Sequence, residues 1–194
     1  MRLISGKYGG RTLRTTVGEG YRPATARLRE ALFSMLEARG VVWDNLCVLD
    51  LFAGSGSLGF EALSRGAFSA LFVETNPKAA ELIQKNAQLL EIEPTAARVI
   101  TDPVAKVLGR RPVHPFGLVF IDPPYAENTV PAALKLLLKN GWLCPGAIVA
   151  GEVESKPQLG KPIEPESFSN DLKVLTDRAY GQTRLILWEL DSEQ

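Results

Sequence analysis

Apolar runs alternate with amphipathic stretches along residues 46–154, and this alternation is the strongest structural signal in the chain. Runs bounded by glycine or polar residues predict strands at 46–52, 70–75, 97–101, 117–121 and 147–154. Apolar residues at helical spacing predict helices between them, at 58–66, 78–91, 104–108 and 129–140. This alternation is typical of parallel βαβ units, so we expect an α/β fold with a doubly wound, Rossmann-like sheet.

The two ends of the chain break this rhythm. Residues 172–180 and 183–190 flank the dipeptide Gly181-Gln182, which predicts an antiparallel hairpin at the end of the parallel sheet. At the front, residues 2–5 and 11–14 are expected to pair as a small β-hairpin through Gly9-Gly10. An amphipathic helix at 25–40 should then dock its apolar stripe on the core and leave its arginines outward. We therefore expect one domain over residues 1–194, with a hairpin-plus-helix appendage at 1–40 and the Rossmann-like core at 41–194.

Charge is unevenly distributed, although the 194 residues carry no formal net charge. Residues 1–40 hold eight basic and three acidic side chains, a net charge of +5. The remaining residues hold 14 basic and 19 acidic side chains, a net charge of −5. A basic front predicts contact with a polyanion such as a nucleic acid, although an ordinary solvated surface gives the same pattern.

The composition argues against several other classes of protein. No apolar run approaches the roughly 20 residues of a membrane span, and the front lacks the apolar stretch of a signal peptide, so we expect a cytoplasmic protein with no membrane partner. Cys47 and Cys144 lie in or beside apolar segments and are expected to be buried free thiols. His114 is the sole histidine, so we expect no metal site. Nothing in the sequence requires more than a monomer.

A glycine-rich loop follows the first predicted strand, in the stretch DLFAGSGSLGFEA. Gly54, Gly56 and Gly59 match the pattern G-x-G-x-x-G at the start of a helix, where glycines let a ligand approach the backbone and its free N–H groups. Glu74 lies 20 residues after Gly54, at the end of the second strand, where an acid accepts hydrogen bonds from ribose hydroxyls. The loop alone fits either a dinucleotide or S-adenosylmethionine.

Two further acids bear on that choice of ligand. Asp50, just before the turn, would repel a pyrophosphate but attract the ammonium and sulfonium groups of S-adenosylmethionine. Asp102, after the third strand, is well placed to accept a hydrogen bond from an adenine amino group. Asp50 therefore favours S-adenosylmethionine, and all of these groups lie at the carboxyl ends of strands, where open α/β sheets bind ligands.

The fourth strand ends in FIDPPY, and this stretch settles the choice. Asp122 and the carbonyl of Pro123 can each accept one N–H from a planar exocyclic amine, which brings the nitrogen lone pair toward a methyl donor. Pro123 and Pro124 cannot continue a ladder, because proline has no N–H, and they fix this geometry in advance. Tyr125 offers a face on which an extruded base can stack. The alternative is a purely structural role, in which Asp122 caps the strand before an ordinary Pro-Pro turn.

These motifs resemble a known family. The stretches DLFAGSGSLGFEALSRGA and FIDPPY, with RLISGKYGGRTL and YRPATARLREALFSML at the front, are similar to the bacterial 16S ribosomal RNA guanine-N2 methyltransferases of the small subunit, the RsmD family. The resemblance covers nearly the whole chain. The DPPY tetrapeptide is shared with enzymes that methylate amines of DNA and protein, so the front segment is the discriminating part.

The resemblance implies a class I S-adenosylmethionine-dependent methyltransferase fold, S-adenosyl-L-methionine as cofactor and 16S rRNA in the small ribosomal subunit as partner. The residues expected to bind the cofactor are Asp50, Phe52, Gly54, Gly56, Glu74 and Asp102. The guanine amine would be held by Asp122, Pro123, Pro124 and Tyr125. Contacts with RNA are expected from Arg2, Lys7, Arg11, Arg22 and Arg27, although Arg22 and Arg27 belong to the front motif and could instead close over the cofactor.

Other functions remain compatible with parts of the sequence. The same DPPY motif would serve an amino-methyltransferase that acts on DNA adenine or on a protein glutamine. A nicotinamide-dependent oxidoreductase could use the same glycine loop, but the sequence offers no evident proton relay for hydride chemistry. A non-catalytic RNA-binding module would leave the DPPY stretch without a purpose.

Overall fold

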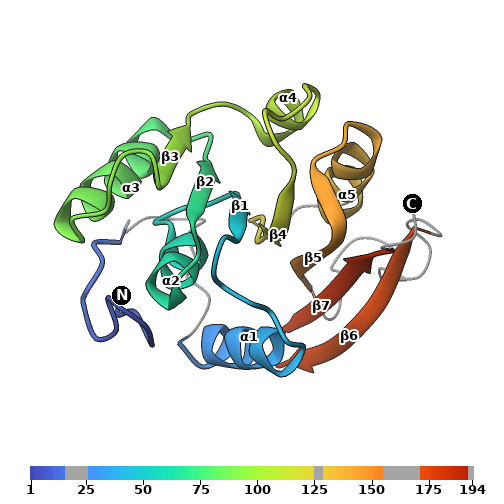
Figure 1. Ribbon diagram of the computed structural model, residues 1–194, viewed down its shortest axis with the longest axis horizontal. Helices are drawn as coiled ribbons and strands as arrows, with labels where there is room; N and C mark the ends of the chain where they lie inside the picture. The colour runs from blue at the N-terminus through green and yellow to red at the C-terminus, as the bar shows by residue number, and fades with distance from the viewer. Residues whose placement is uncertain (16–25, 125–128, 155–170, 192–194) are drawn as a thin grey trace.

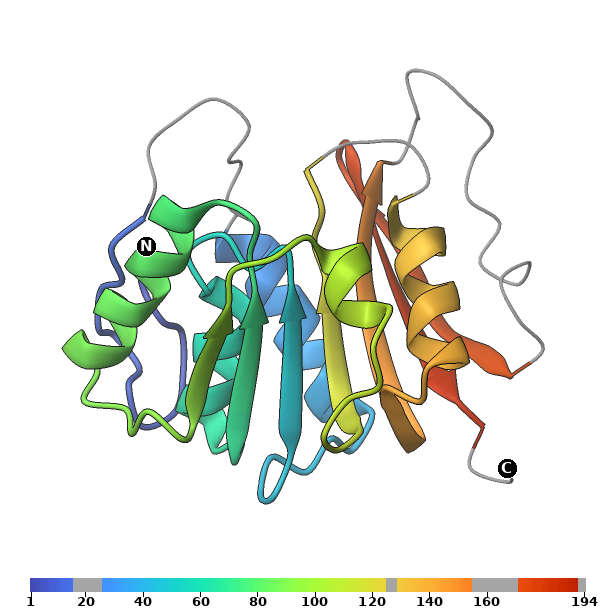
Figure 2. The same cartoon turned by 90° about the horizontal axis from the view of Figure 1, so that it is seen from above.

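The computed structural model describes residues 1–15, 26–124, 129–154 and 171–191. Its centre is a seven-stranded sheet in the order β3-β2-β1-β4-β5-β7-β6. Helices cover both faces of this sheet, as the two perpendicular views show (Figures 1 and 2). The doubly wound plan expected from the sequence is therefore confirmed. None of the helices in the described ranges is long and apolar enough to cross a membrane.

Five strands run parallel and two complete the sheet as an antiparallel hairpin. The parallel strands are β1 (Cys47–Leu51), β2 (Ser69–Val73), β3 (Ala97–Ile100), β4 (Phe116–Ile121) and β5 (Leu143–Glu154). The hairpin consists of β6 (Leu172–Tyr180) and β7 (Thr183–Leu190). Gly181 turns the hairpin with a φ of 63°, a conformation that glycine adopts without steric cost. The predicted C-terminal hairpin is thus confirmed.

The helices begin and end close to the predicted positions. They are α1 (Ala26–Ala38), α2 (Ser57–Arg65), α3 (Pro77–Leu89), α4 (Val104–Leu108) and α5 (Thr129–Lys139). The side chain of Asn76 caps α3 by accepting hydrogen bonds from the N–H groups of Lys78 and Ala79, and Pro77 occupies the first turn. Gly66 ends α2 in the left-handed conformation, with a φ of 113°.

Two apolar clusters lie on opposite faces of the sheet. Alternate strand residues pack with α1, α2 and α3 on one face, where Val48 and Phe120 point. Leu49 and Ile121 point to the other face and pack with α4 and α5. This alternation continues to the strand ends. A side chain at a strand end therefore points to the same face as the residue two positions before it, and the cluster of that residue identifies the face.

Residues 1–15 are fixed tightly to the carboxyl end of α2. The Glu61 carboxylate is fully buried and accepts hydrogen bonds from the backbone N–H groups of Ile4 (2.7 Å) and Ser5 (3.1 Å). The Lys7 N–H donates to the Ser64 carbonyl at 2.6 Å. A Cβ on Gly6 would lie 1.8 Å from that same carbonyl oxygen, so only glycine permits this approach. The front segment is therefore packed as part of the core.

The front segment follows the sequence-based prediction except at one arginine. Its two halves pair at a bridge from Arg2 to Thr12, and the turn between them, at residues 7–10, includes Gly9-Gly10. The expectation that the arginines of α1 point outward is wrong for Arg29, which is 1% exposed and donates to the Arg2 carbonyl at 3.1 Å. Burial lowers the pKa of this guanidinium, and nearby Glu61 opposes that shift.

The two cysteines depart slightly from the prediction. Cys47 and Cys144 are free thiols, as expected, but both are half-buried and not fully buried. Burial raises the pKa of Cys144, and nearby Cys47 adds to the shift. A raised thiol pKa keeps the sulfur protonated and poorly reactive at neutral pH.

We predict that Glu61→Ala destabilises the protein by about 3 kcal/mol, because two backbone N–H groups lose their buried acceptor and Arg65 loses its 3.0 Å ion pair. Urea unfolding of the purified variant measures the change. Glu81→Ala is the matched control, since Glu81 pairs with Lys85 on the exposed face of α3 and its loss should have no measurable effect. Equal stabilities of the two variants would contradict this role of Glu61.

Candidate active site

Four carboxyl groups line the carboxyl edge of the sheet, one on each of four neighbouring strands. Glu74 directly follows β2, Asp50 lies within β1, Asp122 directly follows β4, and Glu152 lies near the end of β5. The strand register pairs Leu51 with Val73 and Ile121, and pairs Ile121 with Gly151. The four acids therefore form a continuous row along this edge, in the order Glu74, Asp50, Asp122 and Glu152.

The loop after β1 has an unusual backbone. Phe52, Gly54 and Gly56 have φ values of 60°, 56° and 79°, so three residues out of five are left-handed. This conformation is costly for phenylalanine, and such strain gathers at functional sites. The Glu74 carboxylate stabilises the loop by accepting hydrogen bonds from the N–H of Gly54 at 2.7 Å and the N–H of Asn76 at 2.8 Å. The sequence indicated that the glycine loop and Glu74 lie at one site, and in the structure the Glu74 carboxylate joins them directly.

Two glycines of the motif serve the packing of α2 against the sheet. A Cβ on Gly59 would lie 2.3 Å from the ring of Phe72, and a Cβ on Gly56 would lie 2.6 Å from the ring of Phe60. The Gly59 N–H donates to the Asp50 carboxylate at 2.9 Å. The absence of these two Cβ atoms therefore lets α2 start directly against Asp50.

Burial raises the pKa of three of the four carboxyl groups. The pKa of Asp50 is raised well above its usual value, first by burial and then by the charges of Asp122 and Glu74, while the Gly59 N–H opposes the shift. Burial raises the pKa of Asp122 to about 7. Burial, with the adjacent charge of Asp122, raises the pKa of Glu152 to about 8. Shifts of this size in neighbouring groups mark candidate functional sites.

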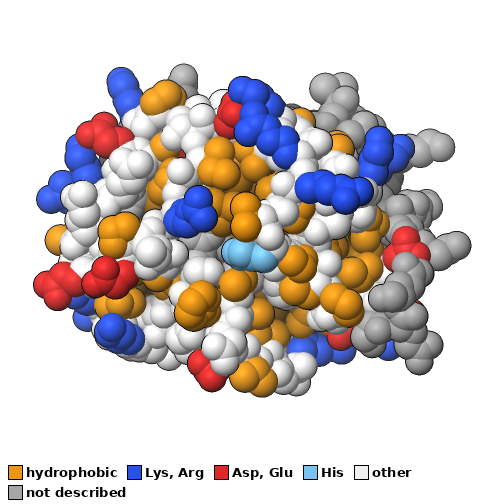
Figure 3. Space-filling model, turned by 45° about the horizontal axis from the view of Figure 1, so that its top comes forward, with side chains coloured by type: hydrophobic (Ala, Val, Ile, Leu, Met, Phe, Trp, Pro, Cys, Tyr) orange, Lys and Arg blue, Asp and Glu red, His pale blue; other side chains and the backbone are white. Residues whose placement is uncertain are grey.

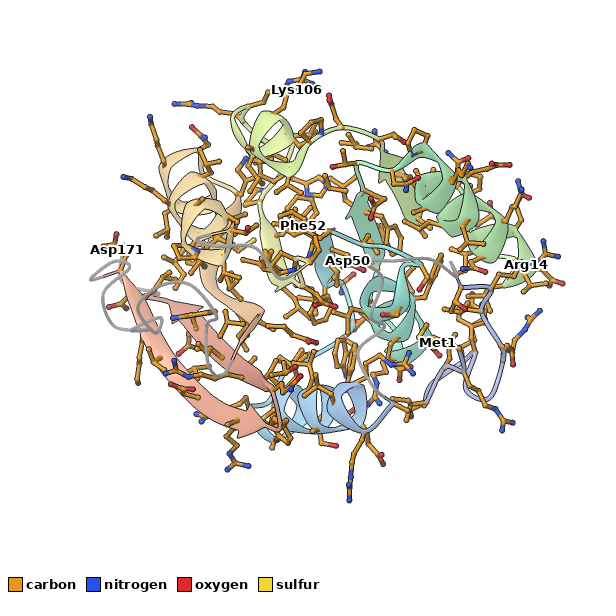
Figure 4. The ribbon with its side chains drawn as sticks, turned by 180° about the vertical axis from the view of Figure 1, so that it is seen from behind. Met1, Arg14, Asp50, Phe52, Lys106 and Asp171 are labelled. Carbon is orange, nitrogen blue, oxygen red and sulfur yellow. The ribbon has the colours of Figure 1, made fainter. Side chains whose placement is uncertain are left out.

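The remaining predicted acid, Asp102, lies apart from this row. It follows β3, the outer strand of the sheet next to β2, and its carboxylate accepts a 2.9 Å hydrogen bond from Lys106 on α4. Lys106 lies at the periphery of the molecule, whereas Asp50 and Phe52 lie near its middle (Figure 4). A group bound between Glu74 and Asp102 would therefore extend outward along the edge of the sheet.

The DPPY stretch falls partly within the described residues. Asp122 and Pro123 are partly buried directly after β4, and Pro124 is exposed. Tyr125 and Arg22, which the sequence assigned to base stacking and RNA contact, lie outside the described residues.

Most of the predicted RNA-binding residues lie far from this row of acids. Lys7 packs at the carboxyl end of α2, and the Arg11 guanidinium donates to the Leu89 carbonyl at the end of α3 at 2.6 Å. Both helix ends lie at the amino edge of the sheet, opposite Asp122. Arg2 is also engaged, since its Nε donates to the Gly10 carbonyl at 2.7 Å. Arg27 differs, because it is exposed in the first turn of α1, at the carboxyl edge (Figure 2).

His114 lies just before β4, at the opposite end of that strand from Asp122. It is the pale blue side chain on the surface in Figure 3, and its ring lies 5.1 Å from the ring of Phe116. It therefore lies outside the row of acids, in the loop before β4. Within the described ranges, no three His, Cys, Asp or Glu side chains are arranged to hold a metal ion.

Glu152 is the residue of this row that sequence reasoning missed. It was hidden within an apolar run taken as a buried strand, in the stretch AIVAGEVE. A charged residue between buried neighbours in a strand interior is unusual, and this was the available signal.

The sheet order, the antiparallel hairpin and the glycine loop define the fold of class I S-adenosylmethionine-dependent methyltransferases. The solved structure of yhhF from Escherichia coli aligns with a TM-score of 0.83 and 33% identity, covering 100% of this chain and 99% of that one. An RNA methyltransferase from Salinibacter ruber, solved in complex with S-adenosyl-L-homocysteine, has the same fold, with a TM-score of 0.62 over 89% of this chain and 96% of that one at 14% identity.

The model of the family "Conserved hypothetical protein 95" matches residues 1–189. The Ribosomal RNA small subunit methyltransferase D of Haemophilus influenzae is 39% identical over 87% of this chain and 85% of that relative. The protein of the same name from Escherichia coli is 34% identical over 100% of this chain and 91% of that relative. The chain belongs to this family, the RsmD family that the sequence motifs indicated.

We predict that Asp122→Asn stabilises the protein increasingly as pH rises. Folding raises the pKa of Asp122 from about 4 to about 7, so the folded protein retains a proton that the unfolded chain releases between these values. Stability is therefore lost as pH rises through this interval and stays lost above it. Asp50, Glu74 and Glu152 are the titratable neighbours in the row, and their negative charges act in the same direction.

The measurement is the Tm of wild type and variant between pH 4.5 and pH 8.5. One pKa unit is worth about 1.4 kcal/mol, and 1 kcal/mol moves Tm by about 2–4 °C in a chain of this size. We expect the difference in Tm to grow by at least about 5 °C. Asp44→Asn, in an exposed loop at the opposite edge, is the matched control and should show no growth. A constant difference for Asp122→Asn would refute the raised pKa.

Proposed function

We propose that this protein transfers a methyl group from S-adenosyl-L-methionine to the exocyclic N2 amine of a guanine in 16S rRNA of the small ribosomal subunit. The observation that carries the proposal is the position of the Asp122-Pro123 pair directly after β4, beside the Asp50 end of β1. Two acceptors for an amine thus lie next to the glycine loop. The names of the curated relatives support ribosomal RNA as the class of substrate.

The residues at the glycine loop fit the proposed cofactor in charge and shape. Within the described ranges, no cation is paired with the buried Asp50 carboxylate. Burial and the neighbouring acids raise the pKa of this carboxyl group. A ligand with an ammonium and a sulfonium group would supply the missing positive charge. The left-handed turn at Phe52, Gly54 and Gly56 and the Glu74 carboxylate beside it are suited to the ribose.

The acceptor half of the site must activate a weak nucleophile. A guanine N2 lone pair is delocalised into the ring, and bound S-adenosyl-L-methionine supplies an electrophilic methyl group on sulfur. Asp122 and the Pro123 carbonyl would each accept one N–H of the amine and orient the nitrogen in line with that methyl group. The product amine can lose its proton after the transfer, so the mechanism needs no histidine.

Contacts with RNA belong to the same proposal. Arg27 lies at the edge that carries Asp122 and is suited to hold phosphate near the acceptor. Arg2, Lys7 and Arg11 could bind RNA only if it reached the opposite edge, because two of these side chains already donate to backbone carbonyls. A monomer suffices for all the groups named.

We predict that Asp122→Ala reduces methyl transfer by about 10²–10³-fold, the loss typical when one preorganised acceptor or donor is removed. The assay uses labelled S-adenosyl-L-methionine and hypomethylated small ribosomal subunits, followed by nucleoside analysis and mapping of the label. Wild type should form N2-methylguanosine at one position. The affinity of the variant for S-adenosyl-L-homocysteine, measured by calorimetry, should stay within about threefold of wild type, because β1 and its loop are unchanged.

Asp44→Ala serves as the matched control and should keep full activity, because Asp44 lies in an exposed loop at the opposite edge. Near-normal activity of Asp122→Ala would refute the role of this carboxylate. Label in DNA adenine or protein glutamine, with none in subunits, would instead favour another amino-methyltransferase. Stabilisation by NAD and none by S-adenosyl-L-homocysteine would refute the cofactor.

A further inference from the structure

Glu152 is a partly buried acid that the proposed mechanism does not yet use. Its Oε1 atom is shielded from solvent and has no hydrogen-bond partner in the described parts of the chain. Burial of a carboxyl oxygen without a partner costs free energy, so a residue that served only the fold would be better replaced by an apolar one. This cost is explained if a ligand supplies the partner.

The strand register places Glu152 beside Asp122. Gly151 pairs with Ile121 across β5 and β4, so the next residue on each strand is one of the two acids. Ala150 packs on the sheet face covered by α1 and α2, and period-two alternation puts Glu152 on that face. Phe120 packs on the same face, and Asp122 follows it by two residues. The charge of Asp122 also raises the pKa of Glu152, as expected for close neighbours.

Two adjacent acceptors match one edge of guanine in particular. On this edge the N2 amine and the N1–H lie next to each other, and both donate hydrogen bonds. In adenine the atom next to the exocyclic amine is an unprotonated nitrogen, which would face a second carboxylate with a lone pair. A protein glutamine has no ring N–H beside its amide nitrogen.

We propose that Glu152 accepts the N1–H of the acceptor guanine while Asp122 accepts an N–H of its N2 amine, so that Glu152 selects guanine over bases that lack the N1–H. This inference rests on the proposed function and assigns base specificity to a residue outside the DPPY stretch. Asp50 and Glu74 remain on the cofactor side of the row, separated from Glu152 by β4.

The test uses 2-aminopurine, which keeps the N2 amine but has an unprotonated N1. Small subunits are reconstituted with guanine or 2-aminopurine at the mapped acceptor position, and kcat/KM is measured for both. Wild type should prefer guanine by about 10–100-fold, the range for one base-edge hydrogen-bond pattern. Glu152→Gln should reduce this preference by at least about tenfold, because its amide can donate to the unprotonated N1. Comparing the ratio between variants removes differences in the intrinsic reactivity of the two amines.

Controls separate a specificity role from a structural one. Glu93→Gln makes the same chemical change at an exposed position and should leave the guanine preference unchanged. Glu152→Gln should also raise Tm at pH 8.5 relative to wild type, because it removes an acid with a raised pKa. The variant should retain affinity for S-adenosyl-L-homocysteine, because the change lies in the acceptor half of the site alone.

An unchanged guanine preference in Glu152→Gln would overturn the inference while leaving the proposed function intact. Glu152→Met provides a second variant, because it offers N1 neither a donor nor an acceptor and should lose guanine activity without gaining activity on 2-aminopurine. A wild-type protein that methylates neither kind of subunit would instead refute the proposed function itself.

Discussion

The hydrogen bond from the Gly59 N–H to the buried Asp50 carboxylate is the contact on which the site depends. It joins the end of the interior strand β1 to the first turn of α2, and it forms only because Gly59 and Gly56 bring no Cβ against the rings of Phe72 and Phe60. The chain between the two elements must then turn within five residues, which forces Phe52 into a left-handed conformation. The strained loop at the candidate cofactor site is thus a consequence of how closely the helix approaches the sheet.

The row of acids lowers the stability of the fold at the carboxyl edge of the sheet. Asp50, Asp122 and Glu152 each have a pKa raised by burial, so each weakens the fold when it ionises. A well-packed core without function would not retain three such groups on neighbouring strands. Their cost is offset elsewhere, for example by the buried Glu61 carboxylate, which satisfies two N–H groups of the front segment and pairs with Arg65. The two kinds of acid therefore differ in how fully partners in the described chain satisfy them, since Glu61 has three such contacts and Oε1 of Glu152 has none.

The sequence predicted what depends on local pattern. Strand and helix positions follow from apolar periodicity, and the Asn76-Pro77 start of α3 and the Gly181 turn follow from the conformations that these residues prefer. Contacts between distant segments could not be predicted in this way. The burial of Arg29 depends on Met1 and Arg2, and the partner-free Oε1 of Glu152 depends on its neighbours across three strands. Periodicity marks such positions as strand or helix but does not reveal their electrostatic surroundings.

The charge of the candidate site also limits how RNA could approach it. Four carboxyl groups in a row would repel phosphate when they are ionised, so the RNA backbone would have to stay outside while an uncharged base reached Asp122 and Glu152 at the ends of β4 and β5. Extrusion of the base from its stack meets this requirement, because it separates the ring from its backbone. On this view the basic side chains serve best at a distance from the acids, as Arg27 does at the start of α1. The acidic edge would then select for a base that offers N–H donors, and the phosphates would bind where the acids do not reach.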